Sequence, residues 1–321
     1  MTTSGFPYGQ YFGDVNVLSD IQVLRRDRTW LLGAPRSLER HDVVLWLGCN
    51  ILRTTHLART VVDVLGLLEV DFVAVAGMAY CCGSLQHRNG DLGASRALAD
   101  ASVQRMTAFQ PKTLVVWCPS CFYFYDEILA RRHLFPFRLV HATEFLANHL
   151  EHLRPLMRAH PFSRVALHAH TGTPQRDKNA HFARMLLEAV PGLSVVGLAQ
   201  ESELGRHCTD EVAGRVGTGQ YKGLLDGVVR TAINLNASTL TTIYHSCQRE
   251  LCGYEAASSL QVENFITLLG RSLGVEYPDK YKQYTISKDQ QVILGDAAPY
   301  IQGNGLDPKR AKETIQRTFC A

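Results

Sequence analysis

The sequence has no long apolar run. Its longest hydrophobic stretches are the length of a β-strand, whereas a membrane-spanning helix needs about 20 consecutive apolar residues. The first residues, 1–11, are polar and glycine-rich and lack the apolar centre of a secretion signal. These absences predict a cytoplasmic protein without a membrane span.

The sequence also lacks a large net charge and the sequence fingerprints of common redox cofactors. The net charge is only +3 and no basic run occurs, so nucleic-acid binding has little electrostatic support. The chain contains neither the Gly-x-Gly-x-x-Gly fingerprint of flavin and nicotinamide sites nor the C-x2-C-x2-C run of a ferredoxin. Any redox chemistry in this chain therefore implies a partner that carries the electrons.

Cysteine, in contrast, is abundant. In a chain without a secretion signal, nine cysteines predict a reducing compartment, where clustered cysteines bind metal or react rather than form structural disulfides. Five of them form the pattern C-x31-C-C-G-x34-C-P-S-C and are Cys49, Cys81, Cys82, Cys118 and Cys121.

The number of thiols in this pattern indicates iron. Sulfur ligands select zinc, copper(I) or iron–sulfur clusters. A closed zinc site and an ordinary cubane cluster each take about four ligands, so a fifth thiolate fits a larger, non-standard cluster better. The alternative is a set of free cysteines that fill a core.

These residues resemble the cysteine-rich CCG domain found in the B subunit of heterodisulfide reductase and its relatives. That family carries C-x(31–38)-C-C-G-x(33–34)-C-x-x-C, usually twice, and the resemblance covers roughly residues 40 to 285. It implies that the five cysteines hold one noncubane [4Fe-4S] cluster. It also implies an oxidoreductase acting on sulfur groups, in which a disulfide is reduced or formed.

The resemblance also implies partners. In the family, electrons come from a ferredoxin-like subunit, which in turn contacts a flavin-containing subunit. One branch reduces the mixed disulfide of coenzyme M and coenzyme B. The other resembles a bacterial sulfur-oxidising complex that acts on sulfur held by a lipoate-binding protein, and we favour it because residues 263–270 and 277–281 look like its members. A non-catalytic electron-transfer subunit of a hydroxyacid- or succinate-oxidising complex and a zinc-binding scaffold are the alternatives.

Two polar residues follow the cysteine pair. His87 and Arg88 come soon after Cys82-Gly83 and are candidates for binding an anionic substrate or supplying a proton. Trp117 and Phe122 flank the C-P-S-C segment, where they either wall a pocket or pack in the core. A solvated loop is the competing interpretation for His87 and Arg88.

Strands that alternate with helices predict an α/β fold with mostly parallel sheets. Thr143 is the expected N-cap of a helix that begins near His141. The segments expected as strands of the first half end at the cysteines, where open α/β sheets place their sites; they are 43–47, 72–75 and 113–117.

The pattern then repeats. Residues 239–247, Thr-Leu-Thr-Thr-Ile-Tyr-His-Ser-Cys, echo residues 113–121, which predicts two pseudo-repeated βαβ halves. The predicted domains are an N-terminal arm at 1–40, a cluster-binding CCG domain at 41–155, a degenerate second CCG domain at 156–285 and a helical C-terminal tail at 286–321. The arm is expected to be extended, with a short helix near 15–24, and the tail to include a loop at 297–304. Arm and tail are the candidate docking surfaces.

The second half has lost most of the cysteines. Cys208 and Cys247 match Cys82 and Cys121, whereas no cysteine stands between 121 and 208. The counterpart of Cys49 falls near Thr171. A degenerate second site is expected from His170, His207, Cys208 and Cys247, with His168 and His245 nearby. Three outcomes stay open for it: zinc or a small cluster, a redox-active disulfide, and a relic filled by packing.

Overall fold

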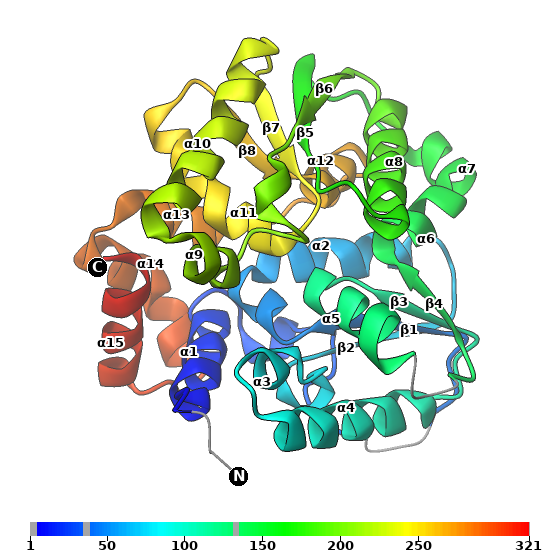
Figure 1. The fold of residues 1–321 in the computed structure, drawn as a ribbon, viewed down its shortest axis with the longest axis vertical. Helices are drawn as coiled ribbons and strands as arrows, with labels where there is room; N and C mark the ends of the chain where they lie inside the picture. Colours follow the sequence, from blue (N-terminus) through cyan, green and yellow to red (C-terminus); the bar gives the residue numbers. More distant parts are fainter. Residues whose placement is uncertain (1–4, 35–38, 131–134, 321) are drawn as a thin grey trace. The chain divides into compact units, whose positions relative to one another are not determined.

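The structure is a computed structural model that describes residues 5–34, 39–130 and 135–320 (Figure 1). It is an α/β protein, as predicted, with two four-stranded sheets. The strands are β1 Val43–Gly48, β2 Phe72–Ala76, β3 Thr113–Val116, β4 Arg138–His141, β5 Ser163–His168, β6 Leu193–Ala199, β7 Thr239–Thr242 and β8 Gln261–Asn264.

Helices make up most of the remaining regular structure. None of those in the described ranges is long and apolar enough to cross a bilayer. They are α1 Tyr8–Asp20, α2 Thr55–Gly66, α3 Ser84–Arg88, α4 Leu92–Thr107, α5 Pro119–Phe124, α6 Ala142–Asn148, α7 Leu150–Leu153, α8 Pro174–Ala189, α9 Asp210–Val216, α10 Thr218–Asn234, α11 His245–Leu251, α12 Phe265–Ser272, α13 Lys280–Ser287, α14 Gln290–Gly303 and α15 Pro308–Phe319.

The described residues form two compact units. The first takes its residues from 1–62, 70–140 and 279–321, and the second from 63–69 and 141–278. The first unit therefore contains both the beginning and the end of the described chain. The domain boundaries at 155 and 285 that the sequence suggests stay a prediction.

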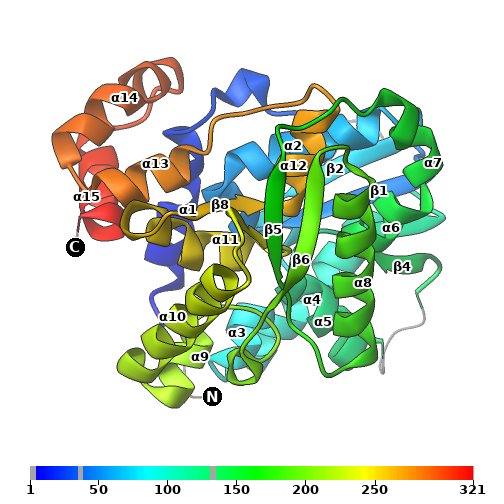
Figure 2. The ribbon, with the colours of Figure 1, turned by 90° about the horizontal axis from the view of Figure 1, so that it is seen from above.

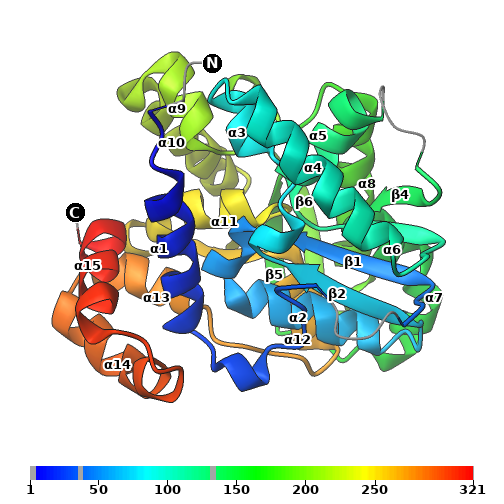
Figure 3. The ribbon, with the colours of Figure 1, turned by 90° about the horizontal axis from the view of Figure 1, so that it is seen from below.

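The first unit is built on the sheet β2-β1-β3-β4. β1 pairs in parallel with β2, Val43 opposite Phe72, and with β3, Val43 opposite Thr113. Every residue of β1 is buried, as expected for a central strand covered on both faces. Helices α2 and α4 lie on opposite faces of this sheet (Figures 1 and 3).

The second unit repeats this topology with the sheet β6-β5-β7-β8. β5 is one of its two inner strands and pairs in parallel with β6 and β7. Helices α8 and α10 flank this sheet on opposite sides, as seen in Figures 1 and 2. The identical strand order confirms the two pseudo-repeated halves.

The N-terminal segment differs from the extended arm expected at 1–40, because residues 8–20 form helix α1. The apolar side of α1 packs against the C-terminal helices α13, α14 and α15 in one buried cluster that includes Leu18, Ile21, Tyr284, Ile293 and Phe319. Figure 3 shows α1 beside α15. The helix forms because folding these residues back buries an apolar surface that an extended arm would leave in water.

Two local predictions need correction. The loop expected at 297–304 is largely helical, since α14 continues through Pro299 to Gly303. The N-cap of α6 is His141 rather than Thr143: the backbone N–H of Thr143 donates to His141 Nδ1 at 3.3 Å. An imidazole nitrogen can accept this bond in the same way as a hydroxyl oxygen does.

Candidate metal centres

All five cysteines of the motif lie at the carboxyl ends of three neighbouring strands of the first sheet, β2, β1 and β3. Cys49 follows β1, Cys81 and Cys82 follow β2, and Cys118 and Cys121 follow β3. Because the chain leaves β1 toward β2 on one side and returns to β3 on the other, this end is a topological switch point, where α/β sheets place ligands. None of the five forms a disulfide with another described residue, and all are buried.

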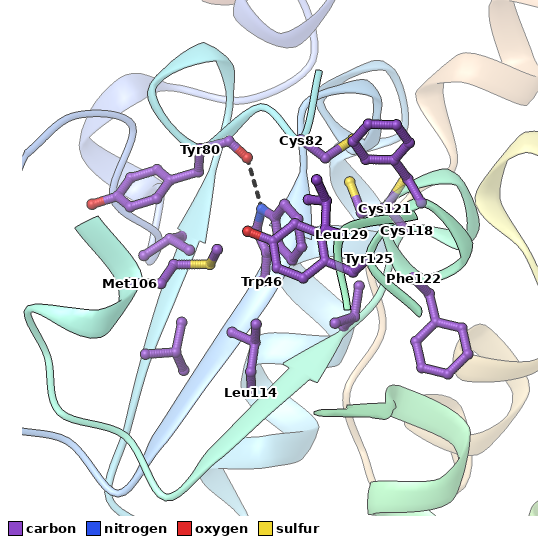
Figure 4. Close-up of a cluster of buried hydrophobic side chains, with 14 of the residues drawn as sticks. Trp46, Tyr80, Cys82, Met106, Leu114, Cys118, Cys121, Phe122, Tyr125 and Leu129 are labelled. Carbon is purple, nitrogen blue, oxygen red and sulfur yellow. Dashed lines mark hydrogen bonds between the residues drawn. The ribbon is translucent and has the colours of Figure 1, made fainter. Parts of the chain in front are cut away.

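The five thiols interact with one another in a single connected series. Cys81 Sγ lies 3.9 Å from Cys49 Sγ. Cys82 interacts with both Cys81 and Cys121, and Cys121 with Cys118. Figure 4 shows Cys82, Cys121 and Cys118 beside the aromatic core of this unit. The structure therefore brings together all five cysteines proposed as cluster ligands.

The pKa values of three of these thiols, Cys81, Cys82 and Cys121, are strongly perturbed. A hydrogen bond from Cys121 and a second from Cys81 lower the pKa of Cys82. Burial and the hydrogen bond to Cys118 raise the pKa of Cys121, and the bond to Cys49 raises that of Cys81. Without a cation, these buried thiols cannot all be deprotonated at the same time, because buried like charges repel one another. Bound iron would offset that repulsion.

Two glycines shape the site. Gly48 has φ +83°, and a Cβ there would lie 3.3 Å from both Cys118 Sγ and Cys121 Sγ. Gly83 has φ +81°, and a Cβ there would lie 2.4 Å from the carbonyl oxygen of Ser95. Both left-handed conformations favour glycine. Gly48 thus leaves room beside two sulfurs, and the residues present fit a cluster of iron and sulfide.

The other predicted residues lie at the edge of this site. His87, on α3, is half-buried and its ring packs edge-on against Phe124. Arg88 is exposed. Trp117 and Phe122 are buried, and Phe122 belongs to the same apolar cluster as Cys118 and Cys121.

Aromatic residues of α1 were missed as part of the site. Phe12 packs with Cys49 and Cys81, and Tyr8 and Tyr11 lie against the same cluster. The tyrosine hydroxyl of Tyr11 donates to Asn50 Oδ1 at 2.8 Å. Aromatics at positions 8, 11 and 12 have the i, i+3, i+4 spacing of one helix face, which is the signal that identifies this cover.

The second unit holds a separate cluster. His168, His170, Cys208 and Cys247 are buried, and their candidate ligand atoms all lie within 4.8 Å of one another. His207, proposed as a ligand from the sequence, is placed elsewhere, with Nδ1 3.2 Å from Ser246 Oγ. His168 takes its place in the group. Cys252 is buried nearby in the sequence, with Sγ 3.6 Å from the carbonyl oxygen of Arg249.

Comparison with known families finds a match that covers the first site. Residues 43–125 match the family model described as the CCG cysteine-rich domain. The first unit contains a CCG domain. All five cysteines of the motif fall within this CCG domain, and the corresponding part of the second unit lies outside the matched residues.

Characterised relatives point the same way. The chain is 26% identical over 271 residues to the D subunit of the dihydromethanophenazine:CoB–CoM heterodisulfide reductase of Methanosarcina barkeri, and 26% identical over 268 residues to that of Methanosarcina mazei. Each match covers 78% of this chain and 64% of the relative, so the chain spans less than two thirds of their length. The resemblance to heterodisulfide reductase subunits is confirmed, with the D subunit as the matched relative.

Proposed function

We propose that this chain is the iron–sulfur subunit of a heterodisulfide reductase-like complex and carries out thiol/disulfide redox chemistry at a noncubane [4Fe-4S] cluster. The observation that carries the proposal is the set of five buried, mutually contacting thiols at the switch point of a CCG domain. Five thiolates exceed what a single zinc ion or one cubane cluster takes.

Cys49, Cys81, Cys82, Cys118 and Cys121 would hold the cluster. When bound, the cluster supplies single electrons to or from a sulfur atom of the substrate. The chain's own residues exclude water: four of the thiols are at most 4% exposed, and Cys49, at 8%, is the most exposed of the five. A substrate sulfur would therefore approach from the side of Cys49, where Phe12 and Tyr11 form an apolar wall.

His87 and Arg88 would serve the substrate rather than the cluster. Arg88 is exposed and positively charged, which suits the carboxylate of an anionic thiol or disulfide compound. His87 is held half-buried with its ring against Phe124, and its imidazole would pass a proton to or from the substrate. These roles are part of the proposal.

For the substrate, we propose sulfur bound to lipoate, as in sulfur oxidation. The second unit does not carry a second set of five cysteines, and residues 263–270 and 277–281 resemble the sulfur-oxidising branch. The partners would be a ferredoxin-like subunit, a flavin-containing subunit and a lipoate-binding protein. The mixed disulfide of coenzyme M and coenzyme B is the second candidate, favoured by the names of the matched relatives.

A relay of electrons without chemistry is a third candidate. The cover of Phe12 over Cys49 and Cys81 favours it, because a substrate must displace or pass these aromatic side chains. In that case the chain would be an electron-transfer subunit of a hydroxyacid- or succinate-oxidising complex.

Anaerobic purification followed by iron and acid-labile sulfide analysis tests the proposal. We expect about four iron atoms per chain, all in the first site. Cys81→Ala should lose most of the iron, whereas Cys252→Ala, which also removes a buried thiol, should keep it. Retention of full iron by Cys81→Ala would contradict the ligand set.

The substrate is tested on the same protein. Oxidised lipoamide, or the coenzyme M–coenzyme B disulfide, is added to the chemically reduced protein, and the electron paramagnetic resonance spectrum of the cluster is recorded. A change with lipoamide alone supports lipoate-bound sulfur. A change with the coenzyme disulfide alone favours the second candidate, and no change with either favours the electron relay.

A further inference from the structure

One group of four buried residues in the second unit has the geometry of a single-ion site: His168, His170, Cys208 and Cys247. His168 Nε2 lies 3.3 Å from Cys208 Sγ, and His170 Nε2 lies 3.2 Å from Cys247 Sγ. The diagonal from Cys208 Sγ to His170 Nε2 is 3.8 Å. A tetrahedral zinc ion with bonds of about 2.3 Å to sulfur and 2.0 Å to nitrogen sets neighbouring sulfur and nitrogen atoms about 3.5 Å apart.

Both imidazoles are oriented for metal binding. His168 Nδ1 donates to the carbonyl oxygen of Ala199 at 2.8 Å, and His170 Nδ1 donates to that of Gly205 at 2.9 Å. A carbonyl can only accept, so the proton sits on Nδ1 in each ring. Each Nε2 therefore points a lone pair at the thiols, the arrangement that carbonyl groups impose on metal-binding histidines.

The strand pairing shows which residues of the first unit correspond to the two histidines. Trp46 pairs with Val116 in the first sheet, and His168 pairs with Thr242 in the second. By this register His168 replaces Trp46, and two residues later His170 replaces Gly48. Gly48 is the residue whose Cβ would come within 3.3 Å of two cluster sulfurs.

The replacement of Gly48 by His170 favours a single metal ion over a cluster in the second unit. A side chain at the position of Gly48 fills the space beside the sulfurs, so the second unit has no room there for a copy of the first cluster. His170 instead brings an imidazole nitrogen within 3.2 Å of Cys247, the counterpart of Cys121. His168 and His170 together supply two nitrogen ligands where the cysteine set has been lost. A relic site filled only by packing would not need such ligands.

A two-iron cluster fits less well. In a cluster with two histidines and two cysteines, the imidazoles bind one iron and the thiolates the other. Here each imidazole is instead paired with a thiol at a distance typical of one shared ion. Tetrahedral coordination by two sulfurs and two nitrogens is characteristic of zinc.

We propose that His168, His170, Cys208 and Cys247 bind one zinc ion in a closed, structural site. All four side chains are at most 4% exposed, so no open position is left for water or a substrate, as in structural rather than catalytic zinc sites. Binding replaces the two thiol protons, and two thiolates balance the charge of Zn²⁺ within the buried site. Zinc here joins the end of β5 and the first turn of α11 to the segment before α9 and carries no electrons.

The site stands apart from the proposed redox function, because none of its residues belongs to the five-cysteine set. Metal content of the whole, anaerobically purified chain tests it. We expect one zinc per chain beside the iron. His168→Ala and Cys208→Ala should lose zinc at least tenfold and leave iron and its spectrum unchanged, whereas His207→Ala and Cys252→Ala should keep the zinc.

X-ray absorption at the zinc edge of the unmodified protein provides a second test that does not depend on the variants folding. Two sulfur and two nitrogen neighbours are expected, at about 2.3 Å and 2.0 Å. Four sulfur neighbours, an oxygen neighbour, iron in place of zinc, or a disulfide between Cys208 and Cys247 in freshly prepared protein would each overturn the proposal. Whether zinc is found or not, the result does not change how the iron analysis of the first site is interpreted.

Discussion

At the scale of single residues, Gly83 explains why the adjacent cysteines of the motif are followed by glycine. Its φ is +81°, and a methyl group there would meet the backbone oxygen of Ser95 at 2.4 Å. Backbone atoms cannot move aside as a flexible side chain does. The turn that delivers Cys82 to the site therefore depends on the missing side chain.

Gly83→Ala is expected to lower the free energy of unfolding by about 3 kcal/mol and to reduce bound iron. Gly90 is the matched control, because it has φ +78° but nothing within 4 Å of its added Cβ. Gly90→Ala should cost only the left-handed strain, about 1 kcal/mol. Denaturant unfolding and iron analysis of both variants check this, and equal losses would show that the contact with Ser95 is unimportant.

The five cysteines of the first site could be predicted from the sequence because their spacing is specific. The second site was harder, since only two of its ligands are cysteines. His168 ends β5 and His170 follows two positions later; the period of two that extended chain has places such a pair on one face, which is a signal that the sequence contains. His207 precedes Cys208 directly, and only the fold shows that it contacts Ser246 instead.

At the scale of elements, α1 links the N-terminal segment to the first site. The sequence did not predict it as a helix from residue 8, since glycines interrupt it at Gly9 and Gly13. Tertiary packing outweighs that low helix propensity: Phe12 is buried against Cys49 and Cys81. Residues 8–20 are therefore helical rather than extended, and their role as a docking surface stays a prediction.

Phe12→Ala should destabilise the first unit by about 3 kcal/mol, the usual cost of removing a buried phenyl ring. It should also open the side of Cys49, so that a chelator removes iron faster. Phe162→Ala is the control, because Phe162 is 76% exposed and its loss should change stability by less than about 0.5 kcal/mol. Iron release at the wild-type rate from Phe12→Ala would show that α1 does not protect the cluster.

The same helical group contains a pH-dependent contact. Asp296 on α14 accepts hydrogen bonds from Lys280 Nζ at 2.6 Å and Tyr284 Oη at 2.6 Å. Burial raises the pKa of this carboxyl, but the bonds to Lys280 and Tyr284 outweigh it, and the net pKa lies below its ordinary value. A lowered folded pKa stabilises the protein above the unfolded pKa, and this contribution is lost as the pH falls through the folded value.

Asp296→Asn should therefore lower the free energy of unfolding at pH 7 by about 0.5–1 kcal/mol, a small effect because the carboxyl is partly exposed. The difference from the unmodified protein should shrink as the pH falls below about 4. Denaturant unfolding from pH 7 to pH 3 measures it. A difference that stays constant over this range would mean that Asp296 acts through packing rather than charge.

At the scale of the whole molecule, the repeat accounts for most of what the sequence could predict. The two sheets share one strand order, as the match between residues 113–121 and 239–247 indicates. The strands β4, β6 and β8 were not predicted. β8 has the sequence Gln-Val-Glu-Asn, which lacks the apolar pattern of a buried strand, and its last residue, Asn264, caps α12 through the N–H of Ile266.

The two proposed metal sites lie in different units. If iron is confined to the first unit and zinc to the second, the chain holds one redox-active centre. Reducing a disulfide takes two electrons, and iron–sulfur clusters exchange them singly. One centre must then be filled or emptied twice in each turnover, through a partner that docks near the first unit.

The isolated chain is accordingly expected to show negligible turnover with nicotinamide or flavin as the only redox partner, because the sequence contains no Gly-x-Gly-x-x-Gly fingerprint and no ferredoxin run. Adding a ferredoxin-like partner should restore electron flow to the cluster, measured as lipoamide-dependent oxidation of that partner. The Cys81→Ala variant, which lacks the cluster, should bind the partner but show no such oxidation. Full turnover by the purified single chain with nicotinamide alone would refute this dependence, since no residue set in the described chain would then account for the two-electron step.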